Sequence, residues 1–395
     1  MSKIIKESTG KPGASRVLLG LLPLLGLGVA IALIFLTGTG LGNSNLPPIE
    51  ELTIERITLP EAGLITLELI NGGPDPVTVA QVLVDDAFWQ FTMTPNQTIP
   101  RLGRATIQVP YPWVQDEAHA IVLITSTGIT FEGEVELAVT TPSFSWELLL
   151  RYALLGFYVG IVPVGLGLAW HPFLRQMSRT GLNAILSLTV GLLVFLFLDT
   201  LLEALEVAAT LPGVFSGEPL VWLLTLLTLL GLQAISGRRA QQSQLAVATM
   251  IALGIGLHNF GEGLAIGAAL AAGEAALGTF LVIGFTLHNI TEGIGIAAPI
   301  ASERPPLWQF IALGALAGAP AILGTWIGGF AYSPFSTTIF MAIGAGAILQ
   351  VIWAVGQMLV RDAKRHNEPV VGWPNLAGLT LGIVIMYATA LLVTV

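Results

Sequence analysis

The chain contains no cysteine and little charge, and these two absences exclude several classes of protein. Without cysteine there is no disulfide framework and no thiolate to bind a metal. Charged residues make up 10% of the 395 residues, whereas a soluble protein carries about 25%. With 54% hydrophobic residues and a mean hydropathy of +0.79, the composition indicates an integral membrane protein surrounded by a lipid bilayer. The net charge of −9 argues against a nucleic-acid partner.

The N-terminal region predicts a short tail followed by a membrane anchor. Residues 1–16 are polar, and they include Lys3, Lys6, Lys11 and Arg16. The apolar run that follows, from residue 17 to about residue 40, has the length of one membrane-spanning helix. A cleaved secretory signal is the alternative, but the run is long for a signal and no A-x-A site follows it. We therefore expect an uncleaved anchor.

Residues 45–142 have a different pattern and predict an all-β domain. Apolar and polar residues alternate in short stretches, separated by turn residues such as the Asn-Gly-Gly-Pro-Asp-Pro run at 71–76. Short alternating strands at this spacing are typical of a β-sandwich. The expected strands are 64–70, 77–84, 105–109, 119–125 and 129–139. No cluster of catalytic residues lies among them, and the sequence indicates no partner for this domain.

Residues 147–394 predict a bundle of eight membrane-spanning helices. The expected spans are 147–170, 183–207, 220–236, 246–272, 276–300, 307–331, 337–360 and 374–394. If the N-terminus is cytoplasmic, twelve of the sixteen basic residues fall in cytoplasmic segments. The positive-inside rule then places the β domain and the C-terminus outside the cytoplasm. We expect this orientation in the plasma membrane, and a homodimer is compatible with it.

Two near-copies of one motif lie 30 residues apart within two consecutive spans: His-Asn-Phe-Gly-Glu-Gly at 258–263 and His-Asn-Ile-Thr-Glu-Gly at 288–293. Residues i and i+4 share one face of a helix, so His258 lies near Glu262 and His288 near Glu292. Consecutive spans run in opposite directions, which lets the two pairs face each other. Nitrogen and oxygen ligands of this kind suit Zn²⁺, Fe²⁺, Mn²⁺ or similar ions. Glycines nearby allow the close helix approach that such a site needs.

Further polar residues in the spans extend this candidate site. Asn259 and Asn289 follow the two histidines and carry carbonyl oxygens suited to a cation. Asp199 and Glu203 are another i, i+4 pair, in the second span of the bundle, and they are expected to line a cation route or to supply a further ligand. The alternative is a purely structural role, in which all these polar side chains hold the helices together. The doubling of the motif argues against it.

The other histidines carry weaker signals. His171 and His366 fall in expected cytoplasmic loops, and His119 falls in the β domain. We expect each of them to be a solvated polar side chain.

With these motifs in place, residues 147–394 resemble the ZIP (Zrt/Irt-like) family of metal transporters. That family has eight helices, with HN-x-P-E-G motifs on its fourth and fifth, and both ends of its bundle outside. Residues 191–204 resemble the family's second-helix H-x-x-P-E-A segment, residues 314–320 its sixth-helix SG-x-x-EP segment, and residues 345–347 its seventh-helix AGA segment. The resemblance implies a main metal site of His258, Glu262, His288 and Glu292. It also implies a second site of Asn259, Asn289 and Glu292, with Glu292 as the bridge.

The sequence also departs from that family. Gly261 and Thr291 stand where the family has proline, and Asp199 stands for the second-helix histidine. Ala319 stands for a sixth-helix glutamate that would help to bind a second ion. We therefore expect the first site to be intact and the second to be weakened.

The function expected from the resemblance is that of a divalent cation permease, not an enzyme, which moves ions into the cytoplasm. Two alternatives remain open. A metal-binding sensor or scaffold without transport would fit the missing acidic positions, and an intramembrane metal-dependent hydrolase would use the same ligands, with one glutamate as general base. The absence of an H-E-x-x-H motif argues against the hydrolase.

Overall fold

The computed structural model describes residues 14–37, 48–236, 243–273 and 275–391. It divides into two compact units, Met1–Pro48 and Ile49–Val395. Within the first unit, α1 is a single helix, Ala14–Thr37. Its 24 residues correspond to about 36 Å of helix, at about 1.5 Å per residue. That α1 crosses the membrane stays a prediction. Lys3, Lys6 and Lys11 lie outside the described residues.

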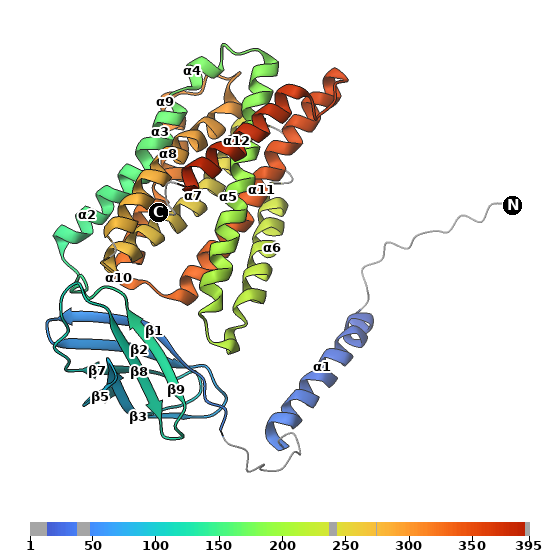
Figure 1. The fold of residues 1–395 in the computed structure, drawn as a ribbon. Coiled ribbons are helices and arrows are strands. Elements are labelled where there is room, and N and C mark those ends of the chain that lie inside the picture. The colour runs from blue at the N-terminus through green and yellow to red at the C-terminus, as the bar shows by residue number, and fades with distance from the viewer. Residues whose placement is uncertain (1–13, 38–47, 237–242, 274, 392–395) are drawn as a thin grey trace. The chain divides into compact units, whose positions relative to one another are not determined.

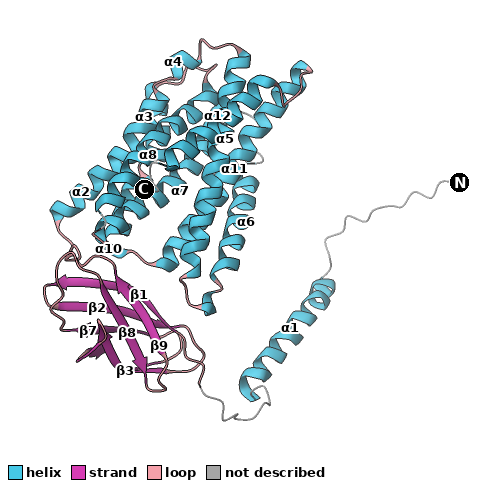
Figure 2. Ribbon diagram, viewed as in Figure 1, coloured by secondary structure: helices cyan, strands magenta, loops and turns pink. Residues whose placement is uncertain are grey.

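Two antiparallel sheets form the β domain, shown in magenta in Figure 2. One sheet has the strand order β1-β2-β7-β5, and the other has the order β4-β3-β8-β9, with β6 paired to β3. Their inner faces share one hydrophobic core, in which Ile65, Leu67, Ile107 and Leu123 are fully buried. The strands in the described residues are β1 Leu52–Glu61, β2 Leu64–Asn71, β3 Val77–Val84, β4 Ala87–Trp89, β5 Thr92–Thr94, β6 Thr98–Ile99, β7 Arg104–Val109, β8 His119–Thr125 and β9 Thr130–Val135.

The expected strands are present, but the sequence pattern missed four and overextended one. β1 was missed because register shifts between Ile54 and Arg56, and between Thr58 and Glu61, break its alternation. β4, β5 and β6 have only two or three residues each. β9 ends at Val135, four residues before the predicted end at residue 139.

Among the described residues, eight helical segments are long and apolar enough to cross a membrane. They are Trp146–Leu174, Arg179–Ala209, Gly213–Ile235, Gln244–Ala271, Leu277–Ile300, Leu307–Ala331, Pro334–His366 and Trp373–Leu391. Their principal helices are α2 Trp146–Gly156, α3 Val162–Leu168, α4 His171–Leu174, α5 Arg179–Ala209, α6 Gly217–Ser236, α7 Gln244–Ala271, α8 Ala275–Ala297, α9 Leu307–Gly318, α10 Pro320–Ala331, α11 Pro334–His366 and α12 Trp373–Leu391.

Several of the predicted helix ends differ from the structure, and two of them have a clear local cause. α5 begins at Arg179 rather than at residue 183, because the Ser178 side chain accepts a hydrogen bond from the Gly181 N–H and caps the helix. α11 continues to His366 instead of ending at residue 360. Its last turn contains basic residues, which interact favourably with the C-terminal end of the helix dipole, and Asn367 closes it in the left-handed conformation.

Two of the breaks in regular α-helix lie beside the motif helices. Between α2 and α3, residues Phe157–Ile161 form a π-helical turn, which ends two residues before Pro163. Between α9 and α10, the chain is interrupted at Ala319, directly before Pro320. A proline has no N–H to donate within a helix, so it marks such irregularities.

The motif helices α7 and α8 lie inside the bundle. α7 packs against α8, α9, α10 and α11, and α8 packs against α3 (Figure 1). The glycine that follows each motif glutamate explains how closely these helices approach. A Cβ atom on Gly263 would overlap the carbonyl oxygen of Ala321 in α10, and one on Gly293 would overlap that of Val164 in α3. Close approach of this kind was predicted from the glycine content.

Candidate metal centre

The two motifs meet inside the bundle, as their spacing predicted. His258 and Glu262 lie on α7, and His288 and Glu292 lie on α8; each of the four is at most 7% exposed. One ligand atom each from His258, Glu262 and His288 lies within 4.8 Å of the others. These three residues form a group that is able to hold a metal ion.

Glu262 is the centre of this group. Its Oε1 atom lies 3.1 Å from Nε2 of His258 and 2.5 Å from Nε2 of His288. Its Oε2 atom accepts a hydrogen bond of 3.1 Å from the side-chain amide of Asn289. In the described residues its ion-pair partners are the two histidines alone. A buried carboxylate needs a positive or hydrogen-bonding partner, and here the partners are themselves metal ligands.

A residue that the sequence analysis missed orients the first histidine. The hydroxyl of Thr200, in α5, lies 3.1 Å from Nδ1 of His258. Thr200 is buried and follows Asp199 directly. A partner on the second ring nitrogen fixes the orientation of a metal-binding histidine and leaves Nε2 facing the site. A single threonine in an apolar helix has no pattern that distinguishes it, so its neighbour Asp199 was the only signal.

The two asparagines are held so that their carbonyl oxygens are free. The Asn259 amide NH₂ donates to the carbonyl of Ala317, beside the break at Pro320, with a distance of 3.0 Å. The Asn289 amide NH₂ donates to the carbonyl of Val159, within the π-helical turn, with a distance of 3.1 Å. A backbone carbonyl accepts only from the NH₂ end of an amide, which settles the assignment of each side chain. Both Oδ1 atoms are buried and have no hydrogen-bond partner.

The carboxylate of Glu292 also lacks hydrogen-bond donors. It is fully within the bundle, and neither of its carboxylate oxygens has a hydrogen-bond partner. Its charge acts on both His258 and His288, and Asn259 lies beside it without the geometry of a hydrogen bond. Glu292 lies outside the tight group of three. Four buried oxygen atoms without donors, two from Glu292 and one from each asparagine, therefore surround the His–Glu cluster.

The structure does not bring Asp199 and Glu203 into the tight group. Both lie on α5, and their charges act on His258 and Glu262 from outside it. Glu203 lines a cavity of about 630 Å³ together with Ala265 and Ala268, which follow Glu262 on α7. Glu203 is thus the member of the pair that lines this cavity, beside the α7 turns that follow Glu262.

The remaining histidines are not ligands, but two of them are not solvated either. His171, in α4, is buried, and its Nε2 lies 3.0 Å from the carbonyl of Ile300. His119, in β8, is buried against Asp85. The expectation of solvated side chains was wrong for these two residues, because each has a partner within its own domain. His366 is exposed, as expected.

Fold and site together define an integral membrane protein whose helical bundle carries a buried His/Glu group suited to a divalent cation. The sequence model described as the ZIP zinc transporter family matches residues 231–390, which include both motifs. Residues 231–390 are thus similar to the ZIP zinc transporter family, and the bundle carries a His/Glu group that could hold a metal ion. The comparison with curated protein sequences gives no match.

Proposed function

We propose that this protein is a permease for Zn²⁺-class divalent cations, with Fe²⁺ and Mn²⁺ as further substrates, and that it moves them into the cytoplasm. The ion passes between α7 and α8, where His258, Glu262, His288 and Glu292 bind it. The protein lies in the plasma membrane, with α1 as an anchor, the N-terminus in the cytoplasm, and the β domain and the C-terminus outside. The β domain spans residues 45–142, and the transport domain spans residues 147–394.

The observation that carries this proposal is the surplus of buried acceptors around the His–Glu cluster. Burying polar oxygens without donors destabilises a protein, by about 1–3 kcal/mol for each group. The oxygens of Glu292 and the Oδ1 atoms of the two asparagines are in this state. A divalent cation supplies what these oxygens lack, because it accepts electron pairs from oxygen ligands. Polar side chains that serve only to hold helices together are expected to satisfy one another.

The same geometry predicts that the cation competes with protons. Glu262 Oε1 has an Nε2 atom of each histidine beside it, and a hydrogen bond there requires a proton on each nitrogen. A histidine binds a metal through a deprotonated nitrogen, so binding at Nε2 releases those protons. We infer that cation affinity falls as the pH is lowered and that proton release accompanies loading of the site.

The weakened second ion site stays a proposal. Its candidate ligands are Asn259, Asn289 and Glu292, whose oxygens have no donor, and Asp199 and Glu203 lie on α5 outside the tight group. Ala319, at the break before Pro320, brings no carboxylate from the sixth span. We propose one tightly bound ion at the His–Glu cluster and a weaker site at Glu292 and the asparagines.

Uptake of zinc into liposomes tests the transport proposal. Wild-type protein is compared with Glu262→Ala and His288→Ala, and with His366→Ala as a matched control, because His366 is exposed and lies outside the bundle core. We expect uptake from the wild type and the control, and little from the two site variants. Equal uptake by all four proteins would remove the proposal.

Metal binding by the same proteins separates the alternatives. If the wild type binds zinc through Glu262 but gives no flux, a sensor or scaffold replaces the permease. That outcome is favoured by one specific observation, the alanine at position 319. Metal-dependent cleavage of a lipid or peptide by the purified protein would favour the hydrolase instead.

A further inference from the structure

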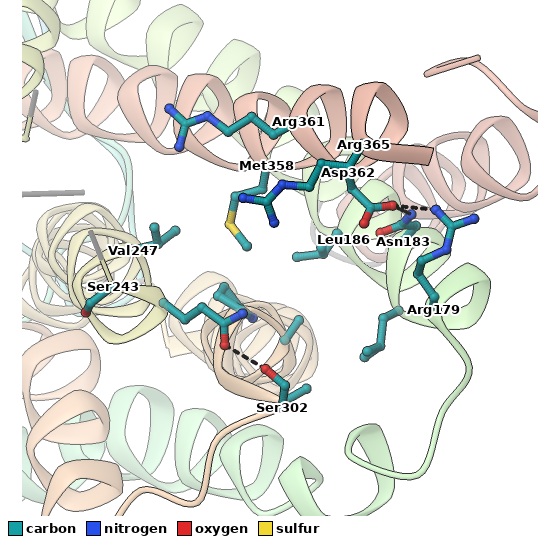
Figure 3. A pocket seen from close by; sticks show the side chains of 15 residues that line it. Arg179, Asn183, Leu186, Ser243, Val247, Ser302, Met358, Arg361, Asp362 and Arg365 are labelled. Atoms are coloured by element: carbon teal, nitrogen blue, oxygen red, sulfur yellow. Dashed lines mark hydrogen bonds and ion pairs between the residues drawn. The ribbon is translucent and has the colours of Figure 1, made fainter. Parts of the chain in front are cut away.

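A second polar cavity lies at the opposite end of α7 from the cavity that Glu203 lines. Its volume is about 350 Å³, and its walls come from α5, α7, α11 and the turn that follows α8 (Figure 3). Gln244, on its wall, begins α7 and precedes His258 by 14 residues, which is about 21 Å of helix. In the proposed orientation this is the cytoplasmic end of the bundle.

The charges that line this cavity do not balance. Three arginines and one aspartate face it: Arg179, Arg361, Arg365 and Asp362. Arg179 is neutralised, because its guanidinium contacts Asp362 at 2.8 Å and Glu368 at 2.5 Å. Asp362 also accepts a hydrogen bond from Asn183. Arg361 and Arg365 have no ion-pair partner in the described part of the chain.

Both arginines are exposed at the cavity, and an anion between them would offset their mutual repulsion. They are separated by four residues on α11, and like charges at that spacing repel by about 0.2–0.5 kcal/mol. Figure 3 shows both side chains extending from α11 over the cavity, on the side away from the Arg179–Asp362 pair. Proximity to the helix C-terminus and the positive-inside rule explain basic residues here, but they do not explain two uncompensated guanidinium groups over one cavity.

The facing wall provides hydrogen-bond donors. The Ser302 hydroxyl donates to Oε1 of Gln244 at 2.7 Å, which leaves the NH₂ of that amide available. The Ser243 side chain caps α7, whose N-terminal end carries the positive end of the helix dipole. The cavity therefore combines two free guanidinium groups, an amide donor and a helix N-terminus.

We propose that this cavity binds a phosphate-bearing anion, which Arg361 and Arg365 hold through their guanidinium groups. Guanidinium groups bind phosphate oxygens in pairs, and a volume of this size suits a phosphate headgroup. The phosphate belongs either to an anionic lipid or to a soluble phosphate compound. Because the cavity lies on the helices that carry the metal motifs, the bound anion also removes a positive barrier from the cytoplasmic path of the cation. This last effect rests on the proposed function, whereas binding itself does not.

The test compares two double variants of the full-length chain in nanodiscs. Arg361→Gln with Arg365→Gln removes the two charges in the cavity. Arg304→Gln with Lys364→Gln is the matched control, because it changes the net charge equally at exposed residues that do not line the cavity. Binding of phosphatidic acid is measured by native mass spectrometry, and binding of inorganic pyrophosphate by calorimetry in phosphatidylcholine nanodiscs.

We expect the wild type and the control to bind at least one of the two probes, and the cavity variant to bind it about tenfold or more weakly, as the loss of two charge-assisted contacts implies. Binding of phosphatidic acid alone identifies the source as lipid, and binding of pyrophosphate alone identifies a soluble phosphate. Absence of binding to the wild type, or an equal loss in both double variants, overturns the proposal. Zinc flux is then measured with and without the bound probe. If no protein transports zinc but the cavity still binds phosphate, the permease proposal fails and this one stands.

Discussion

The β domain and the helical bundle each bury a histidine against a carboxylate, and they differ in what surrounds the pair. In the β domain, Asp85 Oδ2 lies 2.8 Å from Nδ1 of His119 and accepts a bond of 2.6 Å from the Tyr111 hydroxyl. Oδ1 of Asp85 accepts from the Ala120 N–H, and the Val114 N–H donates to Nε2 of His119. Every polar atom of this group has a partner within the protein.

The His–Glu cluster in the bundle is different because some of the polar atoms around it have no hydrogen-bond partner. Glu262 is satisfied by its neighbours, but Glu292, Asn259 and Asn289 contribute oxygens that nothing in the described residues satisfies. A buried histidine next to an acid is therefore weak grounds for a metal site. The informative feature is a set of converging acceptors that the fold leaves without donors.

The largest effect on the difference between the two regions is expected from the substitution Glu292→Gln. Because Glu292 is a buried carboxylate without a donor, its neutralisation should stabilise the metal-free protein, by about 1 kcal/mol. The same change should weaken cation binding on the order of a hundredfold, since even outer partners of a ligand are worth 10–100-fold. Thermal unfolding with a chelator and zinc titration measure the two effects. Glu218→Gln, at an exposed helix start, should change neither. A loss of stability in the metal-free variant would contradict our account of the site.

The counterpart in the β domain is Asp85→Asn, for which the opposite pattern is expected. Asp85 accepts three hydrogen bonds, so the substitution should destabilise the domain by about 1–3 kcal/mol and leave zinc flux unchanged. Hydrogen exchange of β8 in the full chain measures the first effect. Asp86→Asn is the control, because Asp86 is the exposed neighbour. Reduced flux in protein that remains folded would show that the two regions are not independent.

A smaller effect is expected from Thr200→Val, which keeps the shape of the side chain and removes the partner of His258 Nδ1. Zinc affinity should fall roughly tenfold, because the ring is no longer held with Nε2 toward the site. Thr249→Val is matched to it, since the Thr249 hydroxyl bonds only to the Leu245 carbonyl of its own helix. If both variants bind zinc equally well, Thr200 has no orienting role.

The smallest effect concerns pH in the β domain. The hydrogen bond to Asp85, followed by burial, raises the pKa of Tyr111 from 10.0 to about 12. A raised pKa means that the folded domain holds this proton more tightly than the unfolded chain does. The resulting stability is fully present below pH 10 and is lost as the pH rises toward about 12. Tyr111→Phe should flatten this part of the stability profile, as measured by unfolding in denaturant at each pH.

The pKa of Asp85 is lowered, and this affects the stability of the β domain at acidic pH. Burial raises it, but the hydrogen bonds from Tyr111, His119 and Ala120 outweigh burial and bring it below the usual 3.8. The contribution to stability is thus present above that value and lost as the pH falls through the lowered pKa. Asp85→Asn should remove this dependence in the same profile.

Much of the bundle was predictable from the sequence, because span length and hydropathy depend on composition alone. The meeting of the two motifs followed from helical periodicity and from the alternating direction of consecutive spans. The π-helical turn at Phe157–Ile161 was not predictable, since the only local sign is Pro163. Neither was Thr200, whose role depends on the packing of α5 against the motif helices.

The arginines near the end of α11 show a different limit. The sequence analysis used Arg361 and Arg365 only as indicators of membrane topology. A count of positive charges does not show whether the charged side chains line a cavity. The continuation of α11 to His366 is what places them over a cavity. The β domain was predictable where strands alternate regularly, and it was missed at β1, where two bulges interrupt the pattern.

The two helix interruptions, near Pro163 and at Pro320, orient the asparagines of the motifs. Each asparagine amide is clamped by a carbonyl on a helix that contains no motif residue, Val159 for Asn289 and Ala317 for Asn259. Both amides keep their carbonyl oxygens without a donor, and the Asn289 NH₂ group also donates to Glu262 at the site. In the proposed permease, recognition of a cation therefore depends partly on the first and sixth spans, outside the repeated hexapeptides.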